Sequence, residues 1–168
     1  MLLKNFNWAW IKYFILILPC FFYSQSGYAT CAGLGCSCAV GTTAVTFGNY
    51  NPILAPATTA NGNVAVTCSA LVLFSASYVI SLSKGASTTY SPRFMSLAAA
   101  HLNYNLYTTA AFASIWGDAT GGTVTVSDSY TAVALSVTRN YTVFGEIPSL
   151  QTVGAGNYTD TVVVTVTY

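Results

Sequence analysis

Cysteines are the residues of this sequence whose type and spacing come closest to a chemical signature. Cys31, Cys36, Cys38 and Cys68 follow the N-terminal region, and Cys20 lies inside it. Four thiolates can hold zinc, but the single residue between Cys36 and Cys38 is shorter than the usual spacing of about two to four residues. An even set in an exported chain indicates disulfides instead, and three connectivities are open. We therefore predict no metal site.

The other candidates for chemistry are isolated from one another. His101 is the only histidine, and a cysteine held in a disulfide is not a nucleophile that it could activate. The acidic residues are scattered rather than paired, which gives no support to general acid–base catalysis. These are Asp118, Asp128, Glu146 and Asp160. The sequence thus predicts a protein that is not an enzyme, without catalytic or cofactor-binding residues.

The first 29 residues have the layout of a secretory signal peptide. Lys4 and Lys12 precede an apolar run at residues 13–23, and Gly27 and Ala29 place small residues where a signal peptidase reads them. A membrane anchor is the alternative, but the run is shorter than the roughly 18–20 residues of a spanning helix. We therefore expect residues 1–29 to be removed on export and residues 30–168 to form the mature domain.

The composition excludes several classes of protein. Hydrophobic residues make up 54% of the chain and charged residues only 5%, against about 25% charged residues in ordinary soluble domains. The mean hydropathy of +0.56 is high, yet past residue 30 no apolar window approaches the length of a membrane span. So few charges argue against a charged disordered tail and against an electrostatic nucleic-acid binder.

Apolar residues alternate with hydroxyl-bearing residues through most of the mature chain. Because side chains of a strand point alternately to opposite faces, each such segment predicts a strand with one apolar face. The many β-branched residues fit a pleated surface and strengthen this prediction. The expected strands lie near residues 64–68, 78–83, 102–107, 124–126, 133–143 and 162–168.

Turn-forming residues separate these segments. Asn61-Gly62, Lys84-Gly85 and Gly121-Gly122 are pairs that favour turns. Short strands divided by turns predict an all-β fold, a two-sheet antiparallel sandwich in a single domain. Residues 95–101 alternatively fit one helical turn.

A series of short motifs runs in order from Cys38 to Tyr168. They are CAV at 38–40, FGNYNP at 47–52, GNVAVTC at 62–68, YVISLSKG at 78–85, RFM at 93–95, LNYNLY at 102–107, WGD at 116–118, YTVFGEIP at 141–148, Gln151 and GNYTD at 156–160. With these motifs the chain resembles the spore coat protein U family, whose members include subunits of archaic chaperone–usher pili.

This resemblance implies an incomplete immunoglobulin-like antiparallel β-sandwich completed by donor-strand complementation. In such pilins the final strand is missing, which leaves a hydrophobic groove between the sheets. A periplasmic chaperone fills the groove temporarily, and the N-terminal extension of a neighbouring pilus subunit fills it permanently. The implied partners also include an outer-membrane usher, and the implied destination is the cell surface. Neither nucleic acid nor a membrane span after signal removal is expected.

The placement of the cysteines on the expected strands suggests how they pair. A further strand is expected to begin at Cys38, before the strand that ends at Cys68, which predicts a bridge between these neighbouring strands. Cys31 and Cys36 would then pair locally.

The last segment predicts the donor-strand groove and the chaperone-binding edge. Val162, Val164, Val166 and Tyr168 share one apolar face, and no turn or partner strand follows them in the sequence. A long apolar edge is an aggregation hazard unless something covers it. We therefore expect another chain to cover these four residues. The alternative is that residues 162–168 form an interior strand of a complete sandwich.

The predicted function is a structural subunit of a chaperone–usher surface pilus, supporting adhesion and biofilm formation. A self-contained secreted coat or matrix protein is the alternative. Residues 30–37 contain two glycines and only one large apolar side chain, Leu34, and glycine weakens a strand. This segment is therefore predicted to be a poor donor strand, which suggests a tip or minor subunit.

Overall fold

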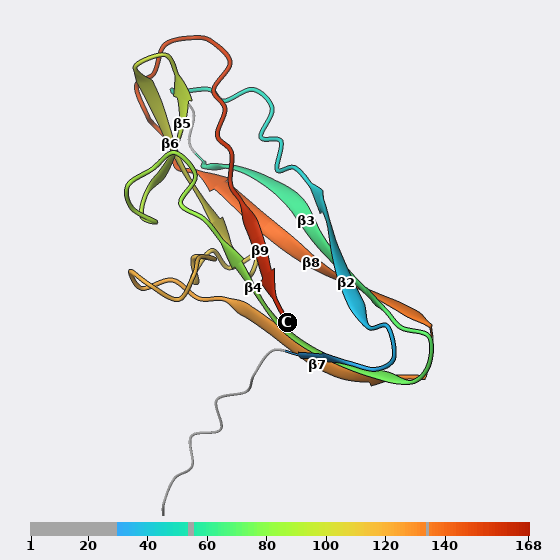
Figure 1. Ribbon diagram of the computed structural model, residues 1–168. Coiled ribbons are helices and arrows are strands. Elements are labelled where there is room, and N and C mark those ends of the chain that lie inside the picture. The colour runs from blue at the N-terminus through green and yellow to red at the C-terminus, as the bar shows by residue number, and fades with distance from the viewer. Residues whose placement is uncertain (1–29, 54–55, 134) are drawn as a thin grey trace, which may run out of the picture.

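The computed structural model of the protein describes residues 30–53, 56–133 and 135–168, and Figure 1 shows their arrangement. The predicted signal peptide, residues 1–29, lies outside this part. The strands of the described part are β1 (Thr30–Ala32), β2 (Ser37–Thr43), β3 (Thr58–Ser69), β4 (Phe74–Leu82), β5 (Arg93–Leu97), β6 (Ala100–Tyr107), β7 (Val126–Ala132), β8 (Ser136–Ile147) and β9 (Val164–Thr167). Within these ranges, no helix has the length and apolar character needed to cross a membrane.

The strands form two sheets with antiparallel pairing. The larger sheet has the order β2-β3-β8-β6-β5. In the smaller sheet β7 pairs with one edge of β4, whereas β1 and β9 follow one another along its other edge. The two sheets enclose a common core (Figure 1). The prediction of an all-β antiparallel sandwich is therefore confirmed.

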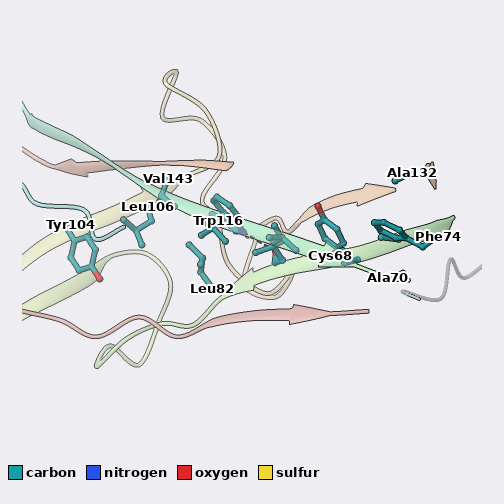
Figure 2. Close-up of a cluster of buried hydrophobic side chains, with 14 of the residues drawn as sticks. Cys68, Ala70, Phe74, Leu82, Tyr104, Leu106, Trp116, Ala132 and Val143 are labelled. Carbon is teal, nitrogen blue, oxygen red and sulfur yellow. Dashed lines mark hydrogen bonds between the residues drawn. The ribbon is translucent and has the colours of Figure 1, made fainter. Parts of the chain in front are cut away.

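Strict alternation explains why β3 and β4 supply the centre of the core. Every second residue of β4, and of β3 from Gly62 onward, is buried, and the residues between them are half-buried. Figure 2 shows side chains of both sheets meeting there, among them Leu82 of β4, Leu106 of β6 and Val143 of β8. Full burial of one such side chain stabilises the fold by roughly 1.5–3 kcal/mol.

Asn61-Gly62, which the sequence predicts as a turn, lies inside β3 instead. The glycine has a different task there, because the chain leaving β2 passes directly over it. A Cβ on Gly62 would lie 2.7 Å from the carbonyl oxygen of Thr43, closer than real Cβ atoms approach backbone. Glycine in a strand interior often marks such a close approach.

Two other segments also differ from expectation. Residues 95–101 form no helical turn but part of the β5–β6 hairpin, in which Ala98 turns the chain with a φ of 50°. Val133 and Leu135, expected on the apolar face of one long strand, lie in the β7–β8 loop and are 93% and 66% exposed. The strand itself begins only at Ser136.

Candidate functional site

A groove of about 1340 Å3 opens between the free edges of the two sheets. Among the described residues β2 pairs only with β3 and β9 only with β4, so the outer edge of each strand has no ladder partner. Apolar side chains of both sheets face the groove, including Val64, Leu82, Leu102, Leu106, Val143 and Ile147. An added strand would find unpaired main-chain groups along its sides and apolar pockets beneath it.

The structure divides the four residues predicted for the groove into two pairs. Val162 and Val164 line it. Val166 is half-buried, packs against the core cluster and lies outside the lining of the groove. Tyr168 is 45% exposed, and its hydroxyl donates to the carbonyl oxygen of Cys38 at 3.4 Å. The apolar face of β9 thus enters the groove at one end and the core at the other.

One wall of the groove is formed by residues 44–52, which follow β2 and join no strand ladder. Val45 lies over two glycines of the larger sheet, because a Cβ on Gly62 or on Gly145 would come within 2.7 or 2.6 Å of its methyl carbons. Further along, Phe47 packs edge to face against Tyr104 with ring centroids 6.0 Å apart. The two glycines therefore let this wall lie on the inner face of the sheet.

The opposite wall, residues 153–163, is anchored by Asp160 and Ser83. The carboxylate of Asp160 accepts from the Tyr104 hydroxyl at 2.6 Å and from the Ala86 N–H at 2.9 Å. Burial, reinforced by the Asp160 hydrogen bond, raises the pKa of Tyr104, so its hydroxyl remains a donor. Ser83 donates its N–H to the Val163 carbonyl and accepts the Val163 N–H on its Oγ, both at 2.9 Å.

A buried arginine holds Ser83 in turn. The side chain of Arg93 is fully buried, and its guanidinium donates twice to the Ser83 carbonyl, at 3.1 and 2.9 Å. It also donates to the Trp116 carbonyl and to Oδ1 of Asn105, both at 2.7 Å. Burial lowers the pKa of Arg93. This cluster fixes the end of β4 and, through Ser83, the groove wall at Val163.

Cys31 lies in β1, Cys36 just before β2, Cys38 near the start of β2 and Cys68 near the end of β3. They form two disulfides, Cys31–Cys36 and Cys38–Cys68. In the part of the chain that the structure describes, no group of three or more histidine, cysteine, aspartate or glutamate side chains is placed to hold a metal ion. His101 is exposed on β6. The chemistry-bearing residues of the sequence are thus kept apart or used as covalent links.

A second candidate site is the aliphatic end of the sandwich, at the lower right of Figure 1, where three loops join the two sheets. The Leu71 N–H donates to the Leu34 carbonyl at 2.9 Å, and the Ala70 N–H to the Leu135 carbonyl at 3.0 Å. Six side chains there each expose half or more of their surface: Leu34, Leu71, Val72, Leu73, Val133 and Leu135. The segments 33–36, 70–73 and 132–136 contain no charged residue. Exposed apolar patches of this kind mark contact surfaces.

Apart from Val162, sequence reasoning does not find the residues of the two groove walls. Residues 44–52 and 153–163 are irregular, and irregular chain leaves no periodic signal. The usable signal is glycine: Gly62 and Gly145 lie inside segments with alternating strand patterns, and a glycine in a strand interior indicates that another segment approaches it closely. The aliphatic end leaves a signal as well, the run ALVL at 70–73 between two alternating segments.

Comparison with known proteins gives one family and a set of similar structures. The profile of the Spore Coat Protein U domain matches residues 29–165 of this chain. One similar solved structure is described as the CsuC-CsuE chaperone-tip adhesion subunit pre-assembly complex from archaic chaperone-usher Csu pili of Acinetobacter baumannii, with a TM-score of 0.53 and 21% identity. The match covers 79% of this chain but only 40% of that one, so the likeness is one of fold. No curated protein matches the chain.

Proposed function

Because the chain belongs to the Spore Coat Protein U domain family, we propose that it is a structural subunit of a chaperone–usher surface pilus. A strand from another protein enters the groove between β2 and β9 and completes the sandwich. A periplasmic chaperone supplies this strand before assembly, an outer-membrane usher receives the complex, and a neighbouring subunit supplies the strand in the fibre. The protein travels through the periplasm to the cell surface after residues 1–29 are removed.

The observation that carries this proposal is the open groove. Two sheet edges without ladder partners face each other across apolar side chains, including Val162 and Val164. A self-contained coat or matrix protein would cover or charge such an edge to avoid association with other chains. A subunit that receives a strand needs the edge open. The open groove therefore favours a pilus subunit over a self-contained coat or matrix protein.

A synthetic donor peptide tests this function. We expect a peptide of about twelve residues that alternates valine or leucine with threonine to stabilise the mature protein. At a hundredfold excess over its Kd, binding adds about 2.7 kcal/mol to the free energy of unfolding. For a domain of this size that is roughly 5–10 °C in Tm, measured by thermal unfolding followed by circular dichroism.

The control peptide has the same composition with its apolar residues grouped together. It presents the same hydrophobicity but cannot direct alternate side chains into the groove. A protein that melts cooperatively at high temperature and ignores both peptides would be a self-contained domain, and the pilus proposal would be wrong.

We further propose that the subunit is adhesive and sits at the fibre tip or in a minor position. Two observations support this. The aliphatic end offers uncharged, exposed side chains on loops that are hydrogen-bonded to one another. Residues 30–36 are held in the fold by the β1–β4 pairing and the Cys31–Cys36 bridge, so they are not free to serve as a donor strand. A subunit that accepts a strand but donates poorly belongs at the end of a fibre.

The adhesive role predicts binding to apolar surfaces through the aliphatic end. Changing Leu34, Leu71 and Leu135 to serine should reduce the protein retained on a methyl-terminated monolayer by about tenfold, because each leucine loses apolar area that leaves water on contact. The control changes Ile53 and Leu150 to serine, since these two residues are 81% and 63% exposed but lie outside the three loops. Equal retention of both variants would contradict the role of the aliphatic end.

A further inference from the structure

The two walls of the groove meet at Tyr50. Its hydroxyl donates to the carbonyl oxygen of Pro148 at 3.1 Å and accepts the N–H of Gln151 at 2.7 Å. Tyr50 belongs to the wall at 44–52, whereas Pro148 and Gln151 lead into the wall at 153–163. These two hydrogen bonds therefore join the walls across the end of the groove that lies away from Cys38 and Tyr168.

The side chain of Gln151 fixes this junction to the larger sheet. Its amide accepts the main-chain N–H of Asn103 and donates to the carbonyl of the same residue, both at 2.8 Å. One amide thereby reproduces the exchange of two hydrogen bonds that a paired strand residue makes. It also donates to the Pro148 carbonyl at 3.1 Å. We call Tyr50, Pro148 and Gln151 the clasp.

Asp160 and Ser83 anchor the second wall to the sheets, but among the described residues no hydrogen bond outside the clasp joins one wall to the other. Apart from the isolated bridge between Ser96 and Thr159, neither residues 44–52 nor residues 153–163 take part in a described strand pairing. At the other end of the groove, the single contact from Tyr168 to the Cys38 carbonyl is longer, at 3.4 Å. The clasp is therefore the firmer of the two links across the groove.

We propose that the clasp is a stop for the incoming strand, with Tyr50 as its positioning residue. This inference rests on the proposed function, in which a strand enters the groove. A strand that meets a closed end is fixed in register, and register matters because a slip of one residue turns every side chain to the opposite face. The clasp thus determines which side chains of the partner strand reach the apolar floor.

The test uses the mature protein with the variant Tyr50→Phe, which keeps the ring and removes both hydroxyl hydrogen bonds. The probe is the alternating valine–threonine peptide carrying a photoreactive benzoylphenylalanine at one end, with cross-links mapped by mass spectrometry. In the wild-type protein, one peptide end should cross-link to a narrow set of residues beside the clasp. In Tyr50→Phe the cross-links should spread along the groove, and the Kd should rise about tenfold.

Tyr90→Phe is the matched control, because the Tyr90 hydroxyl donates to a main-chain carbonyl, that of Leu82 at 3.2 Å, and Tyr90 is absent from the lining of the groove. It should keep the wild-type register. A second variant, Gln151→Glu, removes the amide donor and should spread the cross-links as Tyr50→Phe does. The Tm of each variant without peptide shows whether it is folded, so that a loss of register is not confused with a loss of folding. If wild-type protein binds the peptide and both clasp variants retain its register, the inference is wrong. If the wild-type protein binds no peptide, the proposed function is wrong, and so is the inference that rests on it.

Discussion

Replacing Arg93 with leucine is expected to lower the free energy of unfolding by about 3 kcal/mol. Two effects oppose each other at this site. Removal of the guanidinium favours the fold in one respect, because a buried charge is lost. Burial disfavours the charged form of Arg93, as its lowered pKa indicates. The removal also leaves the Ser83 and Trp116 carbonyls without their donor, whereas Oδ1 of Asn105 keeps the Leu106 N–H. Each buried acceptor left unsatisfied costs about 1–3 kcal/mol, so the loss at the two carbonyls outweighs the relief.

Arg139→Leu is the matched control for this prediction. The Arg139 side chain is 49% exposed, and its Nε lies 3.9 Å from Oδ2 of Asp128; exposed pairs of this kind contribute at most about 1 kcal/mol. Urea unfolding of both variants with their disulfides intact compares the two sites directly. If Arg93→Leu is as stable as Arg139→Leu, relief of the buried charge dominates and our account of the cluster is wrong.

The family and the fold could be predicted from the sequence because both leave regular signals. Alternation of apolar and hydroxyl residues is visible in β3, β4, β6 and β9, and it places the larger part of the core on the correct faces. The resemblance to the spore coat protein U family rests on motifs spread over the whole mature chain, and the family match over residues 29–165 confirms it. Residue alternation and the order of motifs are visible in the sequence itself, so the features that depend on them can be predicted without a structure.

Apart from Val162, the groove walls and their supports could not be predicted, because they depend on contacts between segments far apart in the chain. In the sequence Arg93 looks like an ordinary surface cation, yet its side chain is completely buried. Its guanidinium donates to Asn105 and Trp116, which lie 12 and 23 residues further along the chain. Tyr50 and Gln151 lie 101 residues apart, and nothing in their local sequence links them. The same limit explains the error at Val133 and Leu135, where the apolar pattern continues past the end of a strand into an exposed loop.

The sharpest test of the groove is a charge placed on its inner side. Changing Val164 to glutamate should weaken binding of the alternating donor peptide at least about a hundredfold, because the entering strand would bury a carboxylate without a partner. Without peptide, the open groove leaves that carboxylate in contact with water, so the domain itself should keep most of its stability. The measurement is the Kd of the peptide by fluorescence anisotropy, together with the Tm of each protein alone.

Val163→Glu is the control that separates position from charge. Val163 belongs to the same wall through its main chain, but it is 58% exposed and absent from the lining of the groove, so the same substitution there adds the same charge outside. Its peptide affinity should stay within about twofold of the wild-type value.

Burial under the bound strand raises the pKa of the carboxyl introduced at position 164. Affinity lost by Val164→Glu should therefore return as the pH falls toward the ordinary glutamate pKa of about 4.3. If the two variants bind the peptide with equal affinity at neutral pH, no strand enters between β2 and β9. Only a strand bound there would bury position 164 and leave position 163 exposed.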